Sequence, residues 1–191
     1  MNIPKKIKNQ KFDFENYESL GRFSSYYYQL KSVLKLKPKN VLEIGVGSKL
    51  FSSYLKNMNI DIRTMDYNDK LKPDYVGDIR SMPFENNNFD VVVAFEVLEH
   101  LPFSEQIKIL TEMKRVSKKY IVISVPSTSL NIFAYIRLFP GMKPRYFFFK
   151  FCDAFFYKHK FSGIKGSHYW VLKKNGTTRK HFKTKNKKSG L

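Results

Sequence analysis

The sequence has few of the features that mark secreted and membrane-spanning proteins. It contains a single cysteine, Cys152, which excludes an internal disulfide and fits a reducing compartment. It has no run of about 18 uncharged apolar residues, so no segment is predicted to cross a membrane. The basic N-terminal stretch, residues 1–14, lacks the apolar region of a secretory signal. We therefore expect a cytoplasmic protein.

Acidic residues are scarce in the second half of the chain. Residues 101–191 hold 20 lysines and arginines but only three acids, Glu105, Glu112 and Asp153. A lysine-rich composition imposed by the genome would enrich lysine everywhere, but it would not remove acids from one half. The alternative is a functional basic face, of the kind that meets nucleic acid or an anionic membrane surface.

The order of apolar segments predicts the fold class. A chain of 191 residues is the size of one domain. Short apolar runs typical of buried parallel strands occur at 41–44, 60–65, 74–76, 91–95 and 120–125. Helical patterns lie between or before them, at 16–36, 50–57, from about Glu96 or Leu98, and at 104–116. This alternation predicts an α/β protein with a Rossmann-like, doubly wound, mostly parallel sheet.

We divide this single domain, residues 1–191, into four parts. Residues 1–39 would form an N-terminal helical cap and 40–125 a ligand-binding core. Residues 126–172 would form an aromatic and basic substrate cover, and 173–191 a basic tail.

The first strand leads into VLEIGVGSKL, which has two glycines but lacks a third. Gly45 and Gly47 follow the strand and allow a tight turn with close backbone approach to a ligand. A dinucleotide fingerprint needs another glycine where Leu50 stands, so a nicotinamide cofactor is disfavoured. Lys49 is the unusual residue of this loop: its side chain either points outward or pairs with a carboxylate of the ligand.

Carboxylates follow the next strands of the predicted sheet, where such sheets bind ligands. Asp66 ends the second strand and can accept two ribose hydroxyl protons. Asp78, with Ile79 beside it, suits an adenine ring, because the acid can accept from the amine while the apolar neighbour covers a ring face. The fourth strand ends in FEVLEH, which adds two acids and a histidine.

Together these motifs resemble the class I S-adenosylmethionine-dependent methyltransferases, in the branch of small enzymes that carries EVLEH. VLEIGVG, TMDYND and DYVGDIRSMPFENNNFDVVVAFEVLEHL match in order and spacing over about residues 40–125. The resemblance implies S-adenosylmethionine as cofactor. It also implies methyl transfer to an acceptor, which we expect to be an oxygen nucleophile. The acceptor itself, whether a small molecule, a lipid-like compound or RNA, is not identified by these motifs.

The resemblance also implies roles for individual residues. Glu43 would support the loop and the amino group of the methionine moiety, and Phe95 would lie near that moiety. The remaining cofactor-binding residues implied are Gly45, Gly47, Asp66, Tyr67, Asp78 and Ile79. Tyr26, Tyr27 and Tyr28 would either cover the cofactor or pack as core or interface aromatics.

The FEVLEH segment leaves three alternatives open. If a helix begins near Glu96, then Glu96, Glu99 and His100 lie on one face. With the later His168 they would hold a divalent metal such as magnesium, as in two metal-using subgroups that the segment resembles. Alternatively, Glu99 or His100 acts as a metal-free general base or substrate contact, which makes these two the candidate catalytic residues. The third alternative is a purely structural role.

Residues 130–165 contain twelve phenylalanines or tyrosines and seven lysines or arginines. They would form a pair of helices around the acceptor pocket, a peripheral membrane-contacting surface at the cytoplasmic face, or a nucleic-acid contact. The resemblance implies two more strands after the fifth, but the sequence ends in KTKNKKSGL, so we expect a short C-terminal side. The alternative function is therefore an inactive methyltransferase fold that binds membrane or RNA.

Overall fold

The computed structural model describes residues 12, 14–125, 130–136 and 145–151. Five parallel strands form one sheet in the order β3-β2-β1-β4-β5. Their bounds are β1 Asn40–Ile44, β2 Asp61–Asp66, β3 Tyr75–Val76, β4 Phe89–Phe95 and β5 Ser117–Ser124. The chain moves outward from β1 to β3 and then returns to place β4 on the other side of β1, so the strand order reverses beside β1. Ligands bind at such a reversal, beyond the carboxyl ends of the strands.

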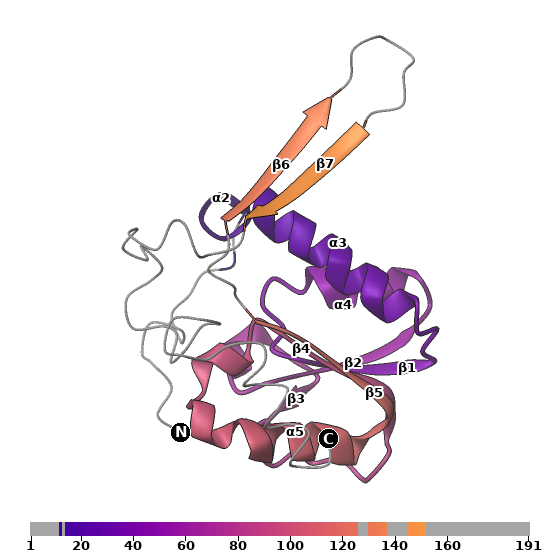
Figure 1. The fold of residues 1–191 in the computed structure, drawn as a ribbon. Coiled ribbons are helices and arrows are strands. Elements are labelled where there is room, and N and C mark those ends of the chain that lie inside the picture. The colour runs from indigo at the N-terminus through magenta and orange to yellow at the C-terminus, as the bar shows by residue number, and fades with distance from the viewer. Residues whose placement is uncertain (1–11, 13, 126–129, 137–144, 152–191) are drawn as a thin grey trace.

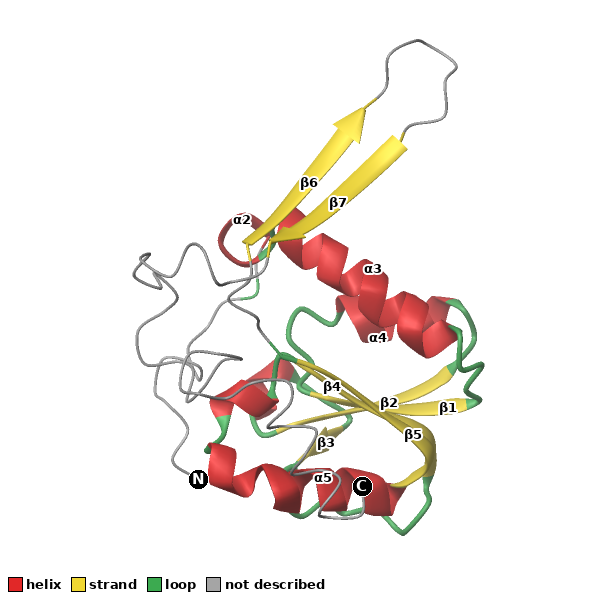
Figure 2. Cartoon of the chain, in the orientation of Figure 1, coloured by secondary structure: helices red, strands yellow, loops and turns green. Residues whose placement is uncertain are grey.

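Helices cover both faces of this sheet (Figure 1). The helices α2 (Phe14–Tyr17), α3 (Leu20–Leu34) and α4 (Leu50–Asn57) lie on one side, and α5 (Gln106–Val116) lies on the other. Short 3-10 turns, η1 Asp69–Leu71, η2 Leu98–His100 and η3 Phe103–Glu105, connect the strands to the next elements. This three-layer arrangement is the predicted doubly wound fold (Figure 2).

The apolar pattern of the helices explains how the layers pack. On the α5 side, Ile109, Leu110, Met113 and Val116 are at most 1% exposed and pack against the sheet. These positions repeat every three or four residues and therefore form one face of the helix. On the other side, a second cluster joins the sheet to α3 and α4, with Val33, Phe51 and Leu55 among its members. The strands are buried between the two clusters, which explains why they appear as continuous apolar runs.

The structure confirms the order of elements predicted over residues 16–125, but it corrects the helix predicted after β4. Glu96 has a left-handed backbone with φ of 54°, and only the 3-10 turn η2 follows it. A continuous α-helix beginning at Glu96 is therefore wrong, and the expected sharing of a helical face by Glu96, Glu99 and His100 loses its basis.

The parts of residues 130–165 that are described are strands rather than the helices considered for this segment. β6 (Leu130–Ile136) and β7 (Arg145–Phe151) pair antiparallel in a sheet of their own. Their sequences, LNIFAYI and RYFFFKF, are rich in aromatic residues, which favour strands. In the described part of the chain, no helix is both long enough and apolar enough to span a membrane.

Candidate cofactor and acceptor site

Two cavities meet at the carboxyl ends of β1, β2 and β4. The larger has a volume of about 760 Å³ and lies between the sheet and α3, and the smaller has a volume of about 120 Å³ and lies beside the β2 end. Five residues contribute to the lining of both cavities: Tyr17, Gly45, Gly47, Phe95 and Glu96. The glycine loop and the end of β4 thus separate two adjoining spaces, as a site for two reactants requires.

The glycine loop follows β1 because its backbone angles suit glycine. Gly45 has φ of 81° and Gly47 has φ of 46°. A Cβ atom at Gly45 would overlap Cγ2 of Val97. The loop and the segment after β4 therefore lie so close together that only glycine fits at position 45. The amide of Gly45 donates to the Met65 carbonyl at 2.8 Å, which joins the loop to β2.

Asp66 holds the loop from the end of the neighbouring strand. Its Oδ2 accepts from the Val46 amide at 3.0 Å, and its Oδ1 accepts from the Asn68 amide at 2.9 Å. The side chain is 6% exposed, and this burial raises its pKa. Each carboxylate oxygen has a second lone pair for a ligand. Asp66 lines the smaller cavity together with Tyr67 and Ile79, and the ribose and adenine roles assigned to these residues stay predictions.

Glu43 is a buried carboxyl group in the middle of the sheet. It lies on β1, lines the larger cavity and is 4% exposed. Burial is the main cause that raises its pKa to about 8, and the nearby Asp66 adds to the effect. Its Oε2 atom has no hydrogen-bond partner among the described residues. A buried acceptor without a partner is costly, so this atom indicates a site for a donor from a ligand.

Glu96 contributes to both cavities through the turn after β4. Its Oε1 accepts from the Ser124 hydroxyl at 2.9 Å, and Ser124 in turn accepts from Gln29 Nε2 at 3.3 Å. This chain of contacts joins the end of β4 to β5 and α3. Burial raises the pKa of Glu96, although Ser124 and the nearby Arg22 partly oppose the shift. The sequence interpretation gave Glu96 only a metal-binding role and missed its position between the cavities.

The wall opposite the sheet comes from α2 and α3. Arg22 Nη1 donates to the Tyr17 hydroxyl at 2.9 Å, and its guanidinium lies 3.8 Å from the centre of that ring. Tyr26 lies 3.1 Å from the Ser48 hydroxyl, so α3 is bonded directly to the glycine loop. Tyr26 and Tyr28 line the larger cavity, whereas Tyr27 is 57% exposed. Two of the three tyrosines considered as a cover therefore reach the site.

The unusual lysine of the loop points outward. Lys49 Nζ donates to the Lys72 carbonyl at 2.8 Å, and Lys49 lines neither cavity, unlike its neighbours Ser48 and Leu50. Of the two alternatives left by the sequence, the structure favours the outward one.

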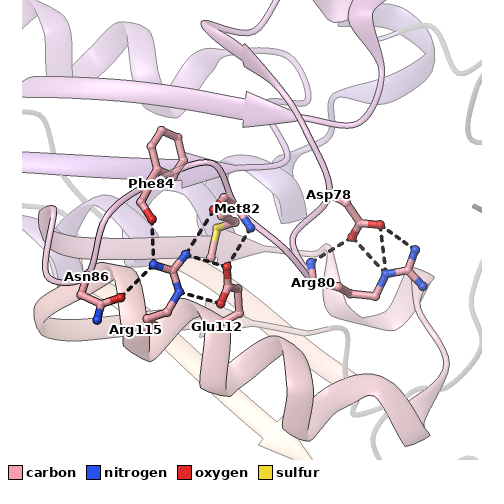
Figure 3. A network of polar contacts seen from close by, with 7 residues as sticks. All are labelled: Asp78, Arg80, Met82, Phe84, Asn86, Glu112 and Arg115. Carbon is pink, nitrogen blue, oxygen red and sulfur yellow. Dashed lines mark hydrogen bonds and ion pairs between the residues drawn. The ribbon is translucent and has the colours of Figure 1, made fainter.

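Of the described residues with a predicted role, Asp78 and Glu99 line neither cavity. Asp78 forms a bidentate ion pair with Arg80, whose Nη2 lies 2.6 Å from Oδ2 (Figure 3). Glu99 is 1% exposed, and burial together with the nearby Glu96 raises its pKa well above the ordinary value. His100 does line the smaller cavity, and its Nε2 is 4.0 Å from Glu99.

The described residues do not fit the magnesium hypothesis. Among them, no three histidine, cysteine, aspartate or glutamate side chains gather as a metal site would require. His168, the fourth ligand suggested by sequence, lies outside the described residues. We therefore assign no step of the reaction to a metal.

Comparison with known proteins agrees with this geometry. Residues 42–123, which span the glycine loop and most of the sheet, match the methyltransferase domain family. Over these residues the chain is similar to that family. A protein of Methanocaldococcus jannaschii, itself uncharacterized, is 32% identical to it over 133 residues, which are 62% of this chain and 58% of that protein.

A solved structure has the same fold. An S-adenosylmethionine-dependent methyltransferase of Archaeoglobus fulgidus aligns with a TM-score of 0.52 and 22% identity, over 61% of this chain and 57% of that one. A protein of Pyrococcus horikoshii aligns with a TM-score of 0.48 and 21% identity, over 60% of this chain and 61% of that one. The chain thus spans less than two thirds of the length of these relatives.

Proposed function

We propose that the protein binds S-adenosylmethionine across the glycine loop and transfers its methyl group to an oxygen nucleophile in the larger cavity. The observation that carries this proposal is the unpartnered Oε2 of Glu43, beside a loop whose Gly45 leaves no room for a Cβ. Glu43 lines the larger cavity and Asp66 the smaller. One carboxyl group would thus meet the amino group of the cofactor and the other its ribose.

The charge of the site supports a cationic ligand. Burial raises the pKa of Glu43, Asp66 and Glu96 because it disfavours the charged carboxylates, and a bound cation would favour the charged forms again. The methionine moiety of S-adenosylmethionine carries an ammonium and a sulfonium. Carboxylates in a largely buried setting stabilise such charges more strongly than water-exposed acids would.

The chemistry that the cofactor supplies is a methyl group on sulfur, which leaves as the acceptor oxygen forms its new bond. The protein would contribute alignment, which supplies roughly 7–11 kcal/mol of the barrier of a bimolecular reaction. Gly45 and Phe95 lie between the two cavities and would position the reacting groups. Tyr26 and Tyr28 would exclude water from the larger one.

The acceptor hydroxyl must also lose a proton, and Glu96 is the group best placed to take it. It lines both cavities, and the Ser124 hydroxyl fixes one of its oxygens. A carboxylate with a raised pKa is a better base than an ordinary one. Glu99, one of the two catalytic candidates from the sequence, lines neither cavity, so Glu96 replaces it in this proposal.

Isothermal titration with S-adenosylmethionine and S-adenosylhomocysteine tests the cofactor. We expect both to bind, and we expect Asp66→Asn to weaken binding by about 10- to 100-fold, because a hydrogen bond to a charged group is lost. Asp61→Asn is the matched control, since Asp61 starts the same strand β2 and is exposed. A melting curve for each variant checks that it folds.

Absence of binding to either compound by the folded wild-type protein would contradict the proposal. Binding without transfer to any lipid, quinone or RNA acceptor would instead favour the inactive, membrane- or RNA-binding alternative. The side chains of residues 130–165, the candidate surface for that alternative, lie outside those described.

A further inference from the structure

The apolar residues that identified α3 in the sequence do not face the core at its N-terminal half. Leu20 is 73% exposed, Phe23 42% and Tyr27 57%, and they lie on one side of the helix. The buried residues of α3, Gln29 and Val33, lie on the opposite side by the same helical spacing. A helix normally turns such a stripe inward, so a stripe that faces outward indicates a surface that binds something apolar.

The stripe continues onto α2 and forms one patch. The ring of Phe14, which is 73% exposed, lies 6.2 Å from the ring of Phe23. Tyr28, beside Tyr27 at a ring distance of 5.2 Å, is 52% exposed and extends the patch toward the larger cavity. We call Phe14, Leu20, Phe23, Tyr27 and Tyr28 the α3 outer face.

The C-terminal side of the α3 outer face is basic, whereas Glu15 and Glu18 lie beside its Phe14 end. Residues 19–42 contain no acid, and they contain five basic residues: Arg22, Lys31, Lys35, Lys37 and Lys39. Lys31 lies one turn after Tyr27, with its Nζ 5.6 Å from the centre of that ring, and Lys35 follows one turn later. Exposed aromatic rings flanked by lysines are the pattern of a helix that lies at the surface of an anionic membrane.

The outer face borders the larger cavity. Leu20 and Tyr28 belong to both the patch and the lining of that cavity, together with Ser24 and Ser25 from the same helix. Any surface bound by the α3 outer face would therefore lie at the edge of the larger cavity.

We propose that the α3 outer face docks the protein on an anionic lipid bilayer. Docking follows from the surface alone. A lipid-like acceptor, entering the larger cavity past Leu20 and Tyr28, follows only if the methyltransferase function proposed above also holds. The patch lies on α2 and α3, and so it is separate from the membrane contact suggested by the sequence of residues 130–165.

The geometry of the rings favours lipid over RNA as the partner. Phe14 and Phe23 meet at an interplanar angle of 61°, and Tyr27 and Tyr28 meet at 77°. Rings that pack edge to face make a continuous apolar surface, whereas base stacking needs open, flat ring faces. The aliphatic Leu20, the most exposed member with Phe14, offers nothing for a base to stack on.

Vesicle flotation of the full chain tests docking without any cofactor. We expect binding to vesicles of equal parts phosphatidylcholine and phosphatidylglycerol, and much weaker binding to phosphatidylcholine alone. The double variant Leu20→Ser, Phe23→Ser should bind the anionic vesicles about tenfold or more weakly, because apolar area no longer enters the bilayer. Tyr54→Ser, Met58→Ser is the matched control, since Tyr54 on α4 and Met58 directly after it are both exposed.

A second measurement distinguishes insertion of α3 side chains into the bilayer from electrostatic attraction between the anionic lipids and the basic second half of the chain. Brominated lipids should quench the added fluorescence of Leu20→Trp but not that of Tyr54→Trp. Equal binding by the serine variant and the wild type, or equal quenching at both positions, would overturn the proposal. So would binding to single-stranded RNA that the serine variant loses in parallel with vesicle binding. Because S-adenosylmethionine is absent, failure here leaves the cofactor proposal standing.

Discussion

At the scale of single residues, the site depends on backbone angles that most residues avoid. Gly45, Lys49 and Glu96 all have positive φ and lie at or beside the ends of β1 and β4. For a residue with a Cβ, this conformation costs roughly 1–2 kcal/mol. Non-glycine residues held in it gather at functional sites, where the surrounding structure compensates for the strain. At Glu96 the compensation is visible, since its amide and its carboxylate both bond to Ser124.

Gly45→Ala should lower the free energy of unfolding by about 2 kcal/mol and remove cofactor binding, because its methyl group would overlap Val97. Urea denaturation and titration with S-adenosylhomocysteine measure the two effects. Gly21→Ala is the control: it lies in α3 with its nearest neighbour, the Ser19 hydroxyl, at 3.9 Å, and it should raise stability by about 0.5 kcal/mol. Equal effects of the two substitutions would show that the tight approach at Gly45 does not matter.

At the scale of elements, a clamp on α5 positions the wall of the smaller cavity. The Arg115 guanidinium donates to the carbonyls of Met82 and Phe84 at 3.1 and 2.7 Å (Figure 3). Glu112 accepts from the Met82 amide at 2.8 Å and holds Arg115 through both of its oxygens. These contacts fasten the connection between β3 and β4, which carries Ile79 into the cavity.

Arg115→Met should therefore lower the free energy of unfolding by about 2 kcal/mol, since several hydrogen bonds to partly buried carbonyls are lost. Chemical denaturation gives this value. Arg63→Met provides the comparison, because Arg63 forms an exposed pair with Asp61 at 3.6 Å, and such pairs contribute about 0–1 kcal/mol. If both variants had the same free energy of unfolding, the contacts of Arg115 would stabilise the fold no more than an exposed ion pair does.

The elements also show what the sequence could predict. Strands and the helix α4 were predictable because buried apolar runs and helical spacing are local signals, as in Leu50–Asn57. The turn after β4 was not, because the left-handed Glu96 is held by Ser124, a partner far along the chain. The outward face of α3 likewise became apparent only with the packing. The ion pair of Asp78 with Arg80 is local, but the adenine-binding interpretation of Asp78 did not consider it. Cofactor residues were predicted through motifs, and the lining of the larger cavity by α3 was mostly missed.

At the scale of the whole molecule, the sheet ends in a group of buried carboxyl groups. Glu43, Asp66, Glu96 and Glu99 all have raised pKa values, and burial is the first cause in each case. A carboxyl group with a raised pKa binds its proton more tightly in the folded protein than in the unfolded chain. The folded state therefore loses stability as the pH rises from the ordinary pKa toward the raised one.

For Glu43 this range runs from 4.5 to about 8. We expect the free energy of unfolding of the ligand-free protein to fall across that range. Glu43→Gln should show a shallower fall, because the amide cannot ionise. Urea titrations at a series of pH values measure both slopes, and Glu85→Gln, a variant at an exposed carboxyl group, serves as control. Identical slopes for the wild type and Glu43→Gln would contradict a raised pKa at this position.

The strand order has a consequence for the order in which the chain can fold during synthesis. β1 pairs with β2 on one side and with β4 on the other, where Val41 meets Val91. β1 and β2 can pair as soon as Asp66 has emerged, but the other edge of β1 stays open until β4 follows. The roughly 30 residues in between take about one to six seconds to translate. During that interval Gly45 can already bond to Met65 of β2, but Val97, which follows β4 and packs against Gly45, has not yet been made. The cofactor site is therefore among the last parts of the core that can form.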